Sequence, residues 1–527
     1  MNLLSACSRP APTPDALRTV VDHELTQSDS IWVRAMRPDT ALSDLARLKQ
    51  PPVYRVNLTY EPQNRELTGT ADILFTNRAD HPLNSLQLDT RALTASDAAD
   101  EADRFALTNL QVNGKPATHT QEKDKVTLPL DKPLAAGATI HLTFSFRTVL
   151  PVVRRPTPEQ EAALDSNWGQ YGAIDNQTHG LSGAIPIVED PGEPRMEYIL
   201  WDVSITVPSE WDIISSGVSI APATTEGDRK TTRIVSVSWS FSLFVAWGLQ
   251  TATQNVDGVT VVVHYPGTMG SVGPEMLAET VQLLRTHEAS LGRYPLSELD
   301  VLPLLLSVEG KSRSGLVLVN AQYMTDEPKW VPAKVTDPWL RRIMGINVGD
   351  WRRQVLAHEL AHSWWGILLW PEMDSLRAPS WLEGLTEATG IAALERVYGP
   401  EAAEARSERQ VYYYRLRRAA GITDMASGKV RPESASPQDY FIMSYFKPAL
   451  FYTQVRRLVG DDAYFAAMRK YIERNRWSIT TDPGPIEELL GNPQVDALYQ
   501  RWLLETHGDA DMGLLTPDQA KQLGLGQ

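Results

Sequence analysis

Residues 355–387 read VLAHELAHSWWGILLWPEMDSLRAPSWLEGLTE, and this stretch decides how the rest of the chain is interpreted. It contains an HExxH pattern, HELAH at 358–362, inside an apolar run of helical period. Residues four apart lie on one face of an α-helix, so His358 and His362 can present two imidazoles to one metal ion. Glu359 lies beside them and can serve as a general base toward a water molecule.

A zinc site needs more than two histidines, because catalytic sites use three protein ligands and keep one position open. The segment WLEGLTE at 381–387 supplies the candidates. Glu383 is the predicted third ligand. Glu387 is four residues further on, hence on the same helical face, where it can accept a hydrogen bond from a ligand imidazole. A bare HExxH also occurs by chance on helix surfaces, but the aliphatic and tryptophan residues around this one indicate a buried helix.

These residues together resemble the zinc site of the aminopeptidase N family of metallopeptidases, the gluzincins. In that family HELAH is followed by 18 residues and then by a glutamate in a WLNEGxAE context. Here residues 363–382, 20 in number, separate His362 from Glu383, and the asparagine before the glutamate is missing. We expect the extra residues in the connection 371–379, which has a proline at each end. The resemblance implies one Zn²⁺ per chain on His358, His362 and Glu383.

A second family motif, YxKG, has its counterpart in SYFKPA at 444–449, with Pro448 in place of the glycine. The resemblance places the family's catalytic tyrosine at Tyr445. A phenol suits that role because its hydroxyl can donate to the oxyanion of a tetrahedral intermediate. A lone tyrosine is more often a core residue, but the following helical sequence also fits the family pattern.

A third motif departs from the family. Relatives carry GxMEN before a Gly-Leu pair, and the glutamate of that motif holds the free α-amino group of the substrate. The pair here is Gly315-Leu316, in a predicted edge strand that can hydrogen-bond an extended peptide substrate. The aligned position of the glutamate is Ser312, and Glu309 is three residues out of register. Peptide hydrolysis is therefore expected, whereas exopeptidase specificity is in doubt.

The domain prediction for the 527 residues follows from periodicity. Residues 1–50 are predicted as a tether with short helices. Residues 51–255 alternate polar and apolar residues between turn signals, which predicts an antiparallel β-saddle or sandwich. Residues 256–512 are predicted as a thermolysin-like, mainly helical catalytic domain, and 513–527 as a tail. The fold class is therefore multidomain, β followed by α/β.

Composition restricts the partners. The net charge of −15 argues against nucleic acid, whose phosphates require basic patches. No apolar run approaches the ~20 residues that span a bilayer. The single cysteine, Cys7, ends Leu4-Ser5-Ala6-Cys7, which has the form of a bacterial lipoprotein cleavage site. Because a signal peptide needs more residues before the cysteine, we expect an exported, lipid-anchored protein if the natural chain starts upstream and a cytoplasmic one otherwise.

The prediction is a zinc metallopeptidase in which Glu359 is the general base and Tyr445 stabilises the oxyanion. The alternative is a non-catalytic peptide- or protein-binding module that retains zinc as a structural element. Ser312, the changed spacing and Pro448 favour the alternative. The presence of Glu359 argues against it, since zinc binding alone does not need that residue.

Overall fold

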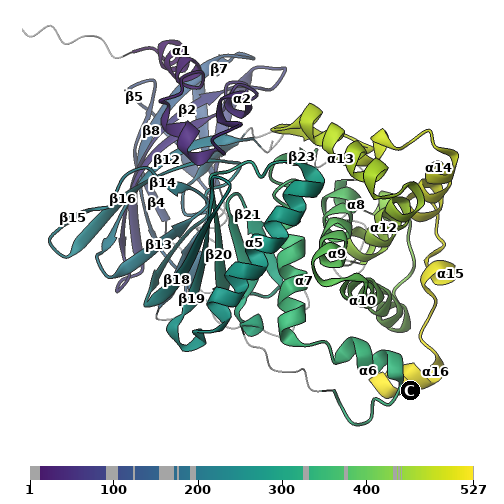
Figure 1. Ribbon diagram of the computed structural model, residues 1–527. Helices are drawn as coiled ribbons and strands as arrows, with labels where there is room; N and C mark the ends of the chain where they lie inside the picture. Colours follow the sequence, from purple (N-terminus) through teal and green to yellow (C-terminus); the bar gives the residue numbers. More distant parts are fainter. Residues whose placement is uncertain are drawn as a thin grey trace, which may run out of the picture. The chain divides into compact units, whose positions relative to one another are not determined.

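The computed structural model describes residues 12–90, 105–122, 125–152, 171–174, 177–189, 197–324, 331–372, 378–430, 436, 440 and 442–525. The chain forms two compact units, one from Met1–Val153 and Gln170–Trp247, the other from Arg154–Gly169 and Gly248–Gln527. A β-rich unit thus precedes a mainly helical one, which confirms the predicted fold class (Figure 1). Among the described residues, no helix is both long and apolar enough to cross a membrane. Cys7 lies outside the described residues.

The division falls at Trp247, whereas the sequence pattern placed it at residue 255. The reason is β18 (Leu249–Val256), which pairs along its length with β19 (Val259–Pro266) of the second unit. The segment predicted as a tail also has structure. It contains α16 (Pro517–Leu523), and Gln522 in this helix accepts hydrogen bonds from the backbone N–H groups of Thr336 and Asp337.

The first unit begins with α1 (Pro14–Glu24), η1 (Ile31–Ala35) and α2 (Ala41–Leu45), followed by strands. The strands are β1 (Val53–Glu61), β2 (Glu66–Thr76), β3 (Leu83–Asp89), β4 (Phe105–Val112), β5 (Lys115–Pro116), β6 (Thr120–Gln121), β7 (Lys125–Leu134), β8 (Thr139–Val149), β9 (Tyr171–Ala173), β10 (Thr178–Leu181), β11 (Ile187–Glu189), β12 (Ile199–Pro208), β13 (Trp211–Ser215), β14 (Val218–Ser219), β15 (Thr224–Glu226), β16 (Arg229–Ser238) and β17 (Leu243–Trp247).

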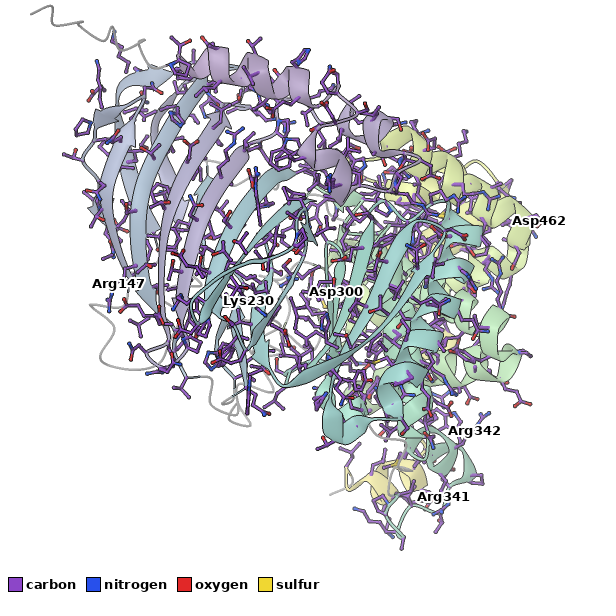
Figure 2. The ribbon with its side chains drawn as sticks, turned by 60° about the vertical axis from the view of Figure 1, so that its left-hand side comes forward. Arg147, Lys230, Asp300, Arg341, Arg342 and Asp462 are labelled. Carbon is purple, nitrogen blue, oxygen red and sulfur yellow. The ribbon has the colours of Figure 1, made fainter. Side chains whose placement is uncertain are left out.

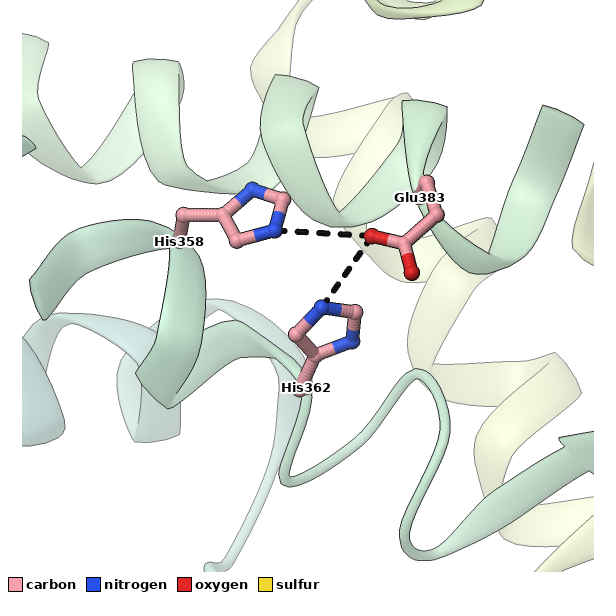
Figure 3. Close-up of side chains that lie close together, drawn as sticks. All are labelled: His358, His362 and Glu383. Carbon is pink, nitrogen blue, oxygen red and sulfur yellow. Dashed lines mark ion pairs between the residues drawn. The ribbon is translucent and has the colours of Figure 1, made fainter. Parts of the chain in front are cut away.

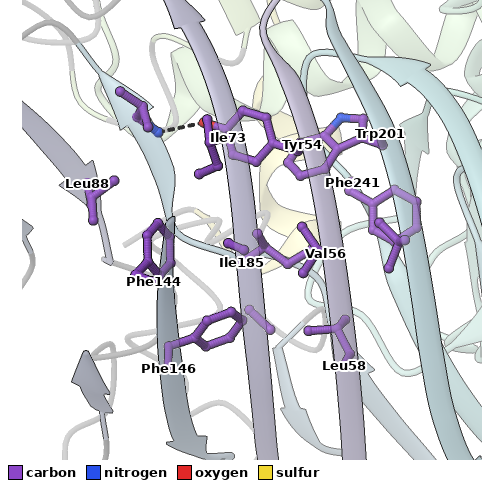
Figure 4. Close-up of a cluster of buried hydrophobic side chains, with 14 of the residues drawn as sticks. Tyr54, Val56, Leu58, Ile73, Leu88, Phe144, Phe146, Ile185, Trp201 and Phe241 are labelled. Atoms are coloured by element: carbon purple, nitrogen blue, oxygen red, sulfur yellow. Dashed lines mark hydrogen bonds between the residues drawn. The ribbon is translucent and has the colours of Figure 1, made fainter. Parts of the chain in front are cut away.

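The described strands of this unit form one large sheet, ordered β14-β16-β12-β1-β2-β8-β4-β5 with β15 also paired to β16, and two four-stranded sheets, β13-β17-β10-β9 and β11-β3-β7-β6. Pairing is antiparallel except between β1 and β12. On the exposed side of β8, Arg147 donates to Glu66 on β2 (2.9 Å; Arg147 is labelled in Figure 2). The alternating residues face an apolar core, in which the Tyr54 and Trp201 rings lie 4.6 Å apart and the Tyr54 hydroxyl accepts from Val188 N–H (2.8 Å; Figure 4).

The second unit adds a smaller sheet and a set of helices. Its remaining strands are β20 (Glu298–Leu304), β21 (Gly310–Arg313), β22 (Leu316–Asn320), β23 (Leu369–Pro371) and β24 (Ser478–Thr480). Its helices are η3 (Gly267–Met269), α5 (Val272–Leu291), η4 (Ala321–Tyr323), α6 (Pro338–Met344), α7 (Val348–Ala361), α8 (Ala378–Leu382), α9 (Gly384–Tyr398), α10 (Pro400–Ala419), η5 (Ser427–Lys429), the π-helix η7 (Ile442–Phe446), α12 (Lys447–Val459), α13 (Asp461–Asn475), η8 (Gly484–Glu488), α14 (Pro493–Tyr499), the π-helix η9 (Gln500–Leu504) and α15 (Gly508–Met512).

The sheet of the second unit is ordered β18-β19-β20-β22-β21. The prediction of an edge strand at Gly315 and Leu316 was wrong. Residues 316–319 lie in β22, which has β20 on one side and β21 on the other. The terminal strand is β21, and it contacts α7, the helix that carries the HExxH motif. Within the sheet, His264 on β19 and Asp300 on β20 make a buried contact (2.6 Å; Asp300 is labelled in Figure 2).

Candidate active site and metal centre

The HExxH motif occupies the last turns of α7. The helix starts at Val348, and the side chain of the N-cap residue Asn347 accepts from Gly349 N–H (2.7 Å) and caps the first turn. His358 and Glu359 are buried, and His362 is the C-cap residue, still in helical conformation. The helix therefore places both imidazoles on one side, as the spacing predicted, with their ring centroids 4.8 Å apart.

Glu383 completes a three-residue group with the two histidines. It lies between α8 and α9, and its Oε2 is 3.5 Å from His358 Nε2 and 3.3 Å from His362 Nε2 (Figure 3). One ligand atom from each of the three residues lies within 4.8 Å of the other two. The 20-residue spacing is thus compatible with convergence. Part of the connection in which we expected the extra residues, 373–377, lies outside the described residues.

The outer ring nitrogens fix the orientation of both imidazoles. His358 Nδ1 lies 2.8 Å from Glu387 Oε2, and His362 Nδ1 lies 2.8 Å from the main-chain oxygen of Trp365. Since both partners are acceptors, each Nδ1 carries the proton and donates it. The Nε2 atom of each ring then faces Glu383 Oε2.

This donor set fits a divalent cation. Burial lowers the pKa of His358, but hydrogen bonds to Glu383 and Glu387 outweigh it and raise the pKa to about 10. Burial raises the pKa of Glu383, but the neighbouring His362 and His358 bring it below its usual range. The pocket thus favours a positive charge beside the two Nε2 atoms. Two imidazoles and one carboxylate with a further open position form a donor set used by catalytic zinc.

Glu387 is held in turn by α10. Arg406 donates to both carboxylate oxygens, with Nη2 2.8 Å from Oε2, and Gln410 Nε2 donates to Oε1 (2.5 Å). Burial raises the pKa of Glu387, but Arg406 and His358 lower it to about 2, so the group is a carboxylate. The sequence interpretation did not include Arg406 or Gln410. Their i, i+4 spacing on α10 was the one available signal.

The packing of α9 against α7 brings Glu387 to His358. Gly390 lies at the close approach, where a Cβ atom would stand 3.2 Å from Ala357 C and His358 N. A larger residue would push the two backbones apart, and the Glu387–His358 contact would lengthen with them. His287 on α5 supports α7 from another side, with Nε2 3.0 Å from the main-chain oxygen of Ala357.

Tyr445 approaches the same site from the π-helix η7. Its ring stacks on His358, with centroids 6.1 Å apart and planes at 20°. Burial, the charge of Glu383 and a hydrogen bond to that carboxylate raise the Tyr445 pKa well above its ordinary value, so the phenol stays protonated. The next residue but one, Lys447, is buried and donates to Asp424 Oδ1 (2.9 Å) and Met425 O (2.7 Å), which fixes η7. Pro448 lies in the first turn of α12, where proline is tolerated.

The comparisons with known proteins agree with this geometry. Residues 346–502 match the model of the Peptidase family M1 domain. These residues belong to peptidase family M1. The segment includes α7, α9 and η7, which carry the residues described above. No curated protein matches the sequence.

The M1 domain and the unit before it share their fold with solved structures. An M1 zinc metallopeptidase from Deinococcus radiodurans is similar at 19% identity with a TM-score of 0.61, covering 89% of this chain and 96% of the other. A two-domain M1 zinc metallopeptidase mutant bound to L-tryptophan is similar at 18% identity with a TM-score of 0.60, covering 89% and 97%. The two-unit architecture is therefore that of two-domain M1 enzymes.

Gly315 and Leu316, predicted to lie in an edge strand that binds the substrate, do not lie in an edge strand. Leu316 is fully buried in β22, and Gly315 occupies the β21–β22 turn with φ 72°. Because β22 has neighbours on both sides, it has no free edge for a peptide. The free edge of this sheet beside the motif helix belongs to β21, which contacts α7. Glu309 precedes it and forms ion pairs with Arg406 (3.7 Å) and Arg409 (3.8 Å).

The Glu387 contact leads to a test on metal affinity. Glu387→Gln replaces the carboxylate that accepts from His358, so the imidazole loses its charged partner while all three ligand side chains remain. We expect zinc affinity to fall about 10-fold to 100-fold, measured by competition titration with a chromophoric chelator. Glu395→Gln on the same helix, whose partner is Arg456, is the matched control. Unchanged affinity in a folded Glu387→Gln protein would contradict the assigned role.

Proposed function

We propose that this protein hydrolyses peptide bonds with one zinc ion per chain. The observation that carries the proposal is the convergence of His358, His362 and Glu383, with the carboxylate of Glu359 on the same helix. The names of the similar structures support it, since they are zinc metallopeptidases and one holds a Tyr-Ser-Ala substrate. His358, His362 and Glu383 are the residues that would hold the metal. When bound, the ion supplies Lewis-acid polarisation of the scissile carbonyl and acidifies a water molecule.

The protein's own residues move the protons. Glu359 takes a proton from the attacking water and passes it to the nitrogen of the leaving amine. The carboxylate is neutral only between these two transfers, so it is regenerated at the end of the cycle. Because Glu359 is buried, its carboxylate interacts more strongly with the charges that develop during these transfers than it would in water.

Tyr445 acts on the developing oxyanion. Its phenol is protonated at neutral pH, and its ring lies over His358, at the edge of the ligand group. A hydrogen bond donated to the carbonyl oxygen strengthens as negative charge develops there, so it stabilises the transition state more than the substrate.

The residues around β21 bear on the substrate class. Ser312 occupies the position at which the resembling family has its amine-anchoring glutamate. Glu309, the nearest acid in sequence, is paired with Arg406 and Arg409. The protein accordingly cleaves peptides without requiring a free α-amino group. Ser312 at this position also favours the second candidate, a binding module with a structural zinc. The position of Glu359 beside the ligands argues against that candidate.

Loss of the base separates the two candidates. Glu359→Gln keeps the metal ligands but cannot accept the proton, so we expect at least a 1000-fold loss of hydrolysis of an internally quenched peptide, with zinc content unchanged by elemental analysis. Asp350→Asn, at an exposed position in the first turn of α7, is the control. An unaltered rate in Glu359→Gln would rule out the mechanism, and an inactive, zinc-loaded wild type would favour the binding module.

Removal of the phenol hydroxyl tests the oxyanion role. Tyr445→Phe retains the ring over His358 and is expected to lower kcat about 100-fold to 1000-fold with little change in KM. Tyr464→Phe in α13 is the control, because it removes a buried hydroxyl elsewhere in the unit. Equal kcat values for Tyr445→Phe and wild type would show that the oxyanion has another donor.

The amine requirement is tested by paired substrates. Peptides of one sequence, with a free or an acetylated N-terminus, are expected to be cleaved at the same bond at rates within about 3-fold of each other, because no ammonium contact is lost. Mass spectrometry identifies the products. Cleavage confined to free N-termini would establish an aminopeptidase and contradict this part of the proposal.

A further inference from the structure

Ser312 contacts the residue proposed as general base. Its Oγ lies 2.9 Å from Glu359 Oε2 and 2.5 Å from the main-chain oxygen of Glu359. The hydroxyl has one proton, which both acceptors share. The Ser312 side chain thus contacts both the carboxylate and the backbone of the same residue on α7.

The hairpin around Ser312 fixes that hydroxyl. Ser312 pairs with Val317 of β22, and Gly310 pairs with Val319. Gly310 also packs directly on the base, since a Cβ atom at this position would lie 2.7 Å from Glu359 Oε1 and 2.8 Å from its Cγ. The strand β21 therefore contacts the Glu359 side chain at two places, through a hydroxyl and through bare backbone.

We propose that Ser312 is a positioning residue for the Glu359 carboxylate. The inference rests on the proposed function, because it takes Glu359 as the proton carrier. The hydroxyl holds Oε2 and so leaves Oε1 to accept and return the proton. A glutamate side chain rotates about several bonds, and an unrestrained carboxylate spends less time in the reactive orientation. Ser312, which stands where the resembling family has its amine-anchoring glutamate, thus acts on the Glu359 carboxylate.

The test is a kinetic comparison of hydroxyl variants on the zinc-loaded full chain. Ser312→Ala is expected to lower kcat about 10-fold to 100-fold, with KM within 2-fold and zinc content unchanged, because a loosened base affects the chemical step and not substrate binding. Ser312→Thr retains the hydroxyl and is expected to restore kcat to within about 3-fold of wild type. Ser314→Ala is the matched control. Its hydroxyl is buried beside the same hairpin and has no hydrogen-bond partner among the described residues.

A double variant separates this inference from the proposed function. If Ser312 acts through Glu359, Ser312→Ala in the Glu359→Gln background lowers the residual rate by less than 2-fold. A kcat equal to wild type in Ser312→Ala, while Glu359→Gln is inactive, overturns the inference alone. A raised KM with unchanged kcat also overturns it and makes Ser312 a substrate contact. Full activity of Glu359→Gln removes the proposed function and this inference together.

Discussion

The structure of the second unit depends on one electrostatic constraint, which is that two imidazole nitrogens and a carboxylate oxygen face one another in a buried space. Such a group is unfavourable unless a positive charge lies among its members. His358, His362 and Glu383 are kept in this arrangement by partners behind them, above all the Glu387 carboxylate that bonds His358 and is itself neutralised by Arg406. The packing of α7, α9 and α10 serves to keep these contacts short.

Glu359, the group that we propose transfers protons, lies on α7, and strand β21 of the sheet contacts its side chain. Glu359 faces β21, where Ser312 donates to it and Gly310 leaves no side chain in its way. Tyr445 reaches the site from η7, whose position Lys447 fixes through Asp424. The proposed base and two of the proposed metal ligands thus share α7, the third ligand lies between α8 and α9, and the proposed oxyanion donor comes from η7.

The sequence predicted the parts of the site that follow from helical spacing. His358 and His362 on one face, and Glu387 one turn after Glu383, need only the 3.6-residue period. It did not predict contacts that depend on the tertiary arrangement. The edge strand of the sheet is β21 and not β22, and β18 belongs to the second unit, so the boundary falls at Trp247. Arg406 contacts Glu387 only because α10 packs beside α9. The contact of the Ser312 hydroxyl with Glu359 was not predicted either, because it depends on how the hairpin meets α7.

The most direct test of the metal site is anomalous diffraction from crystals grown with zinc, with data collected on both sides of the zinc edge. We expect one strong peak per chain, about 2.0–2.2 Å from His358 Nε2, His362 Nε2 and a Glu383 oxygen. A zinc peak located elsewhere, or no peak with the Glu383 side chain turned away from both histidines, would contradict it.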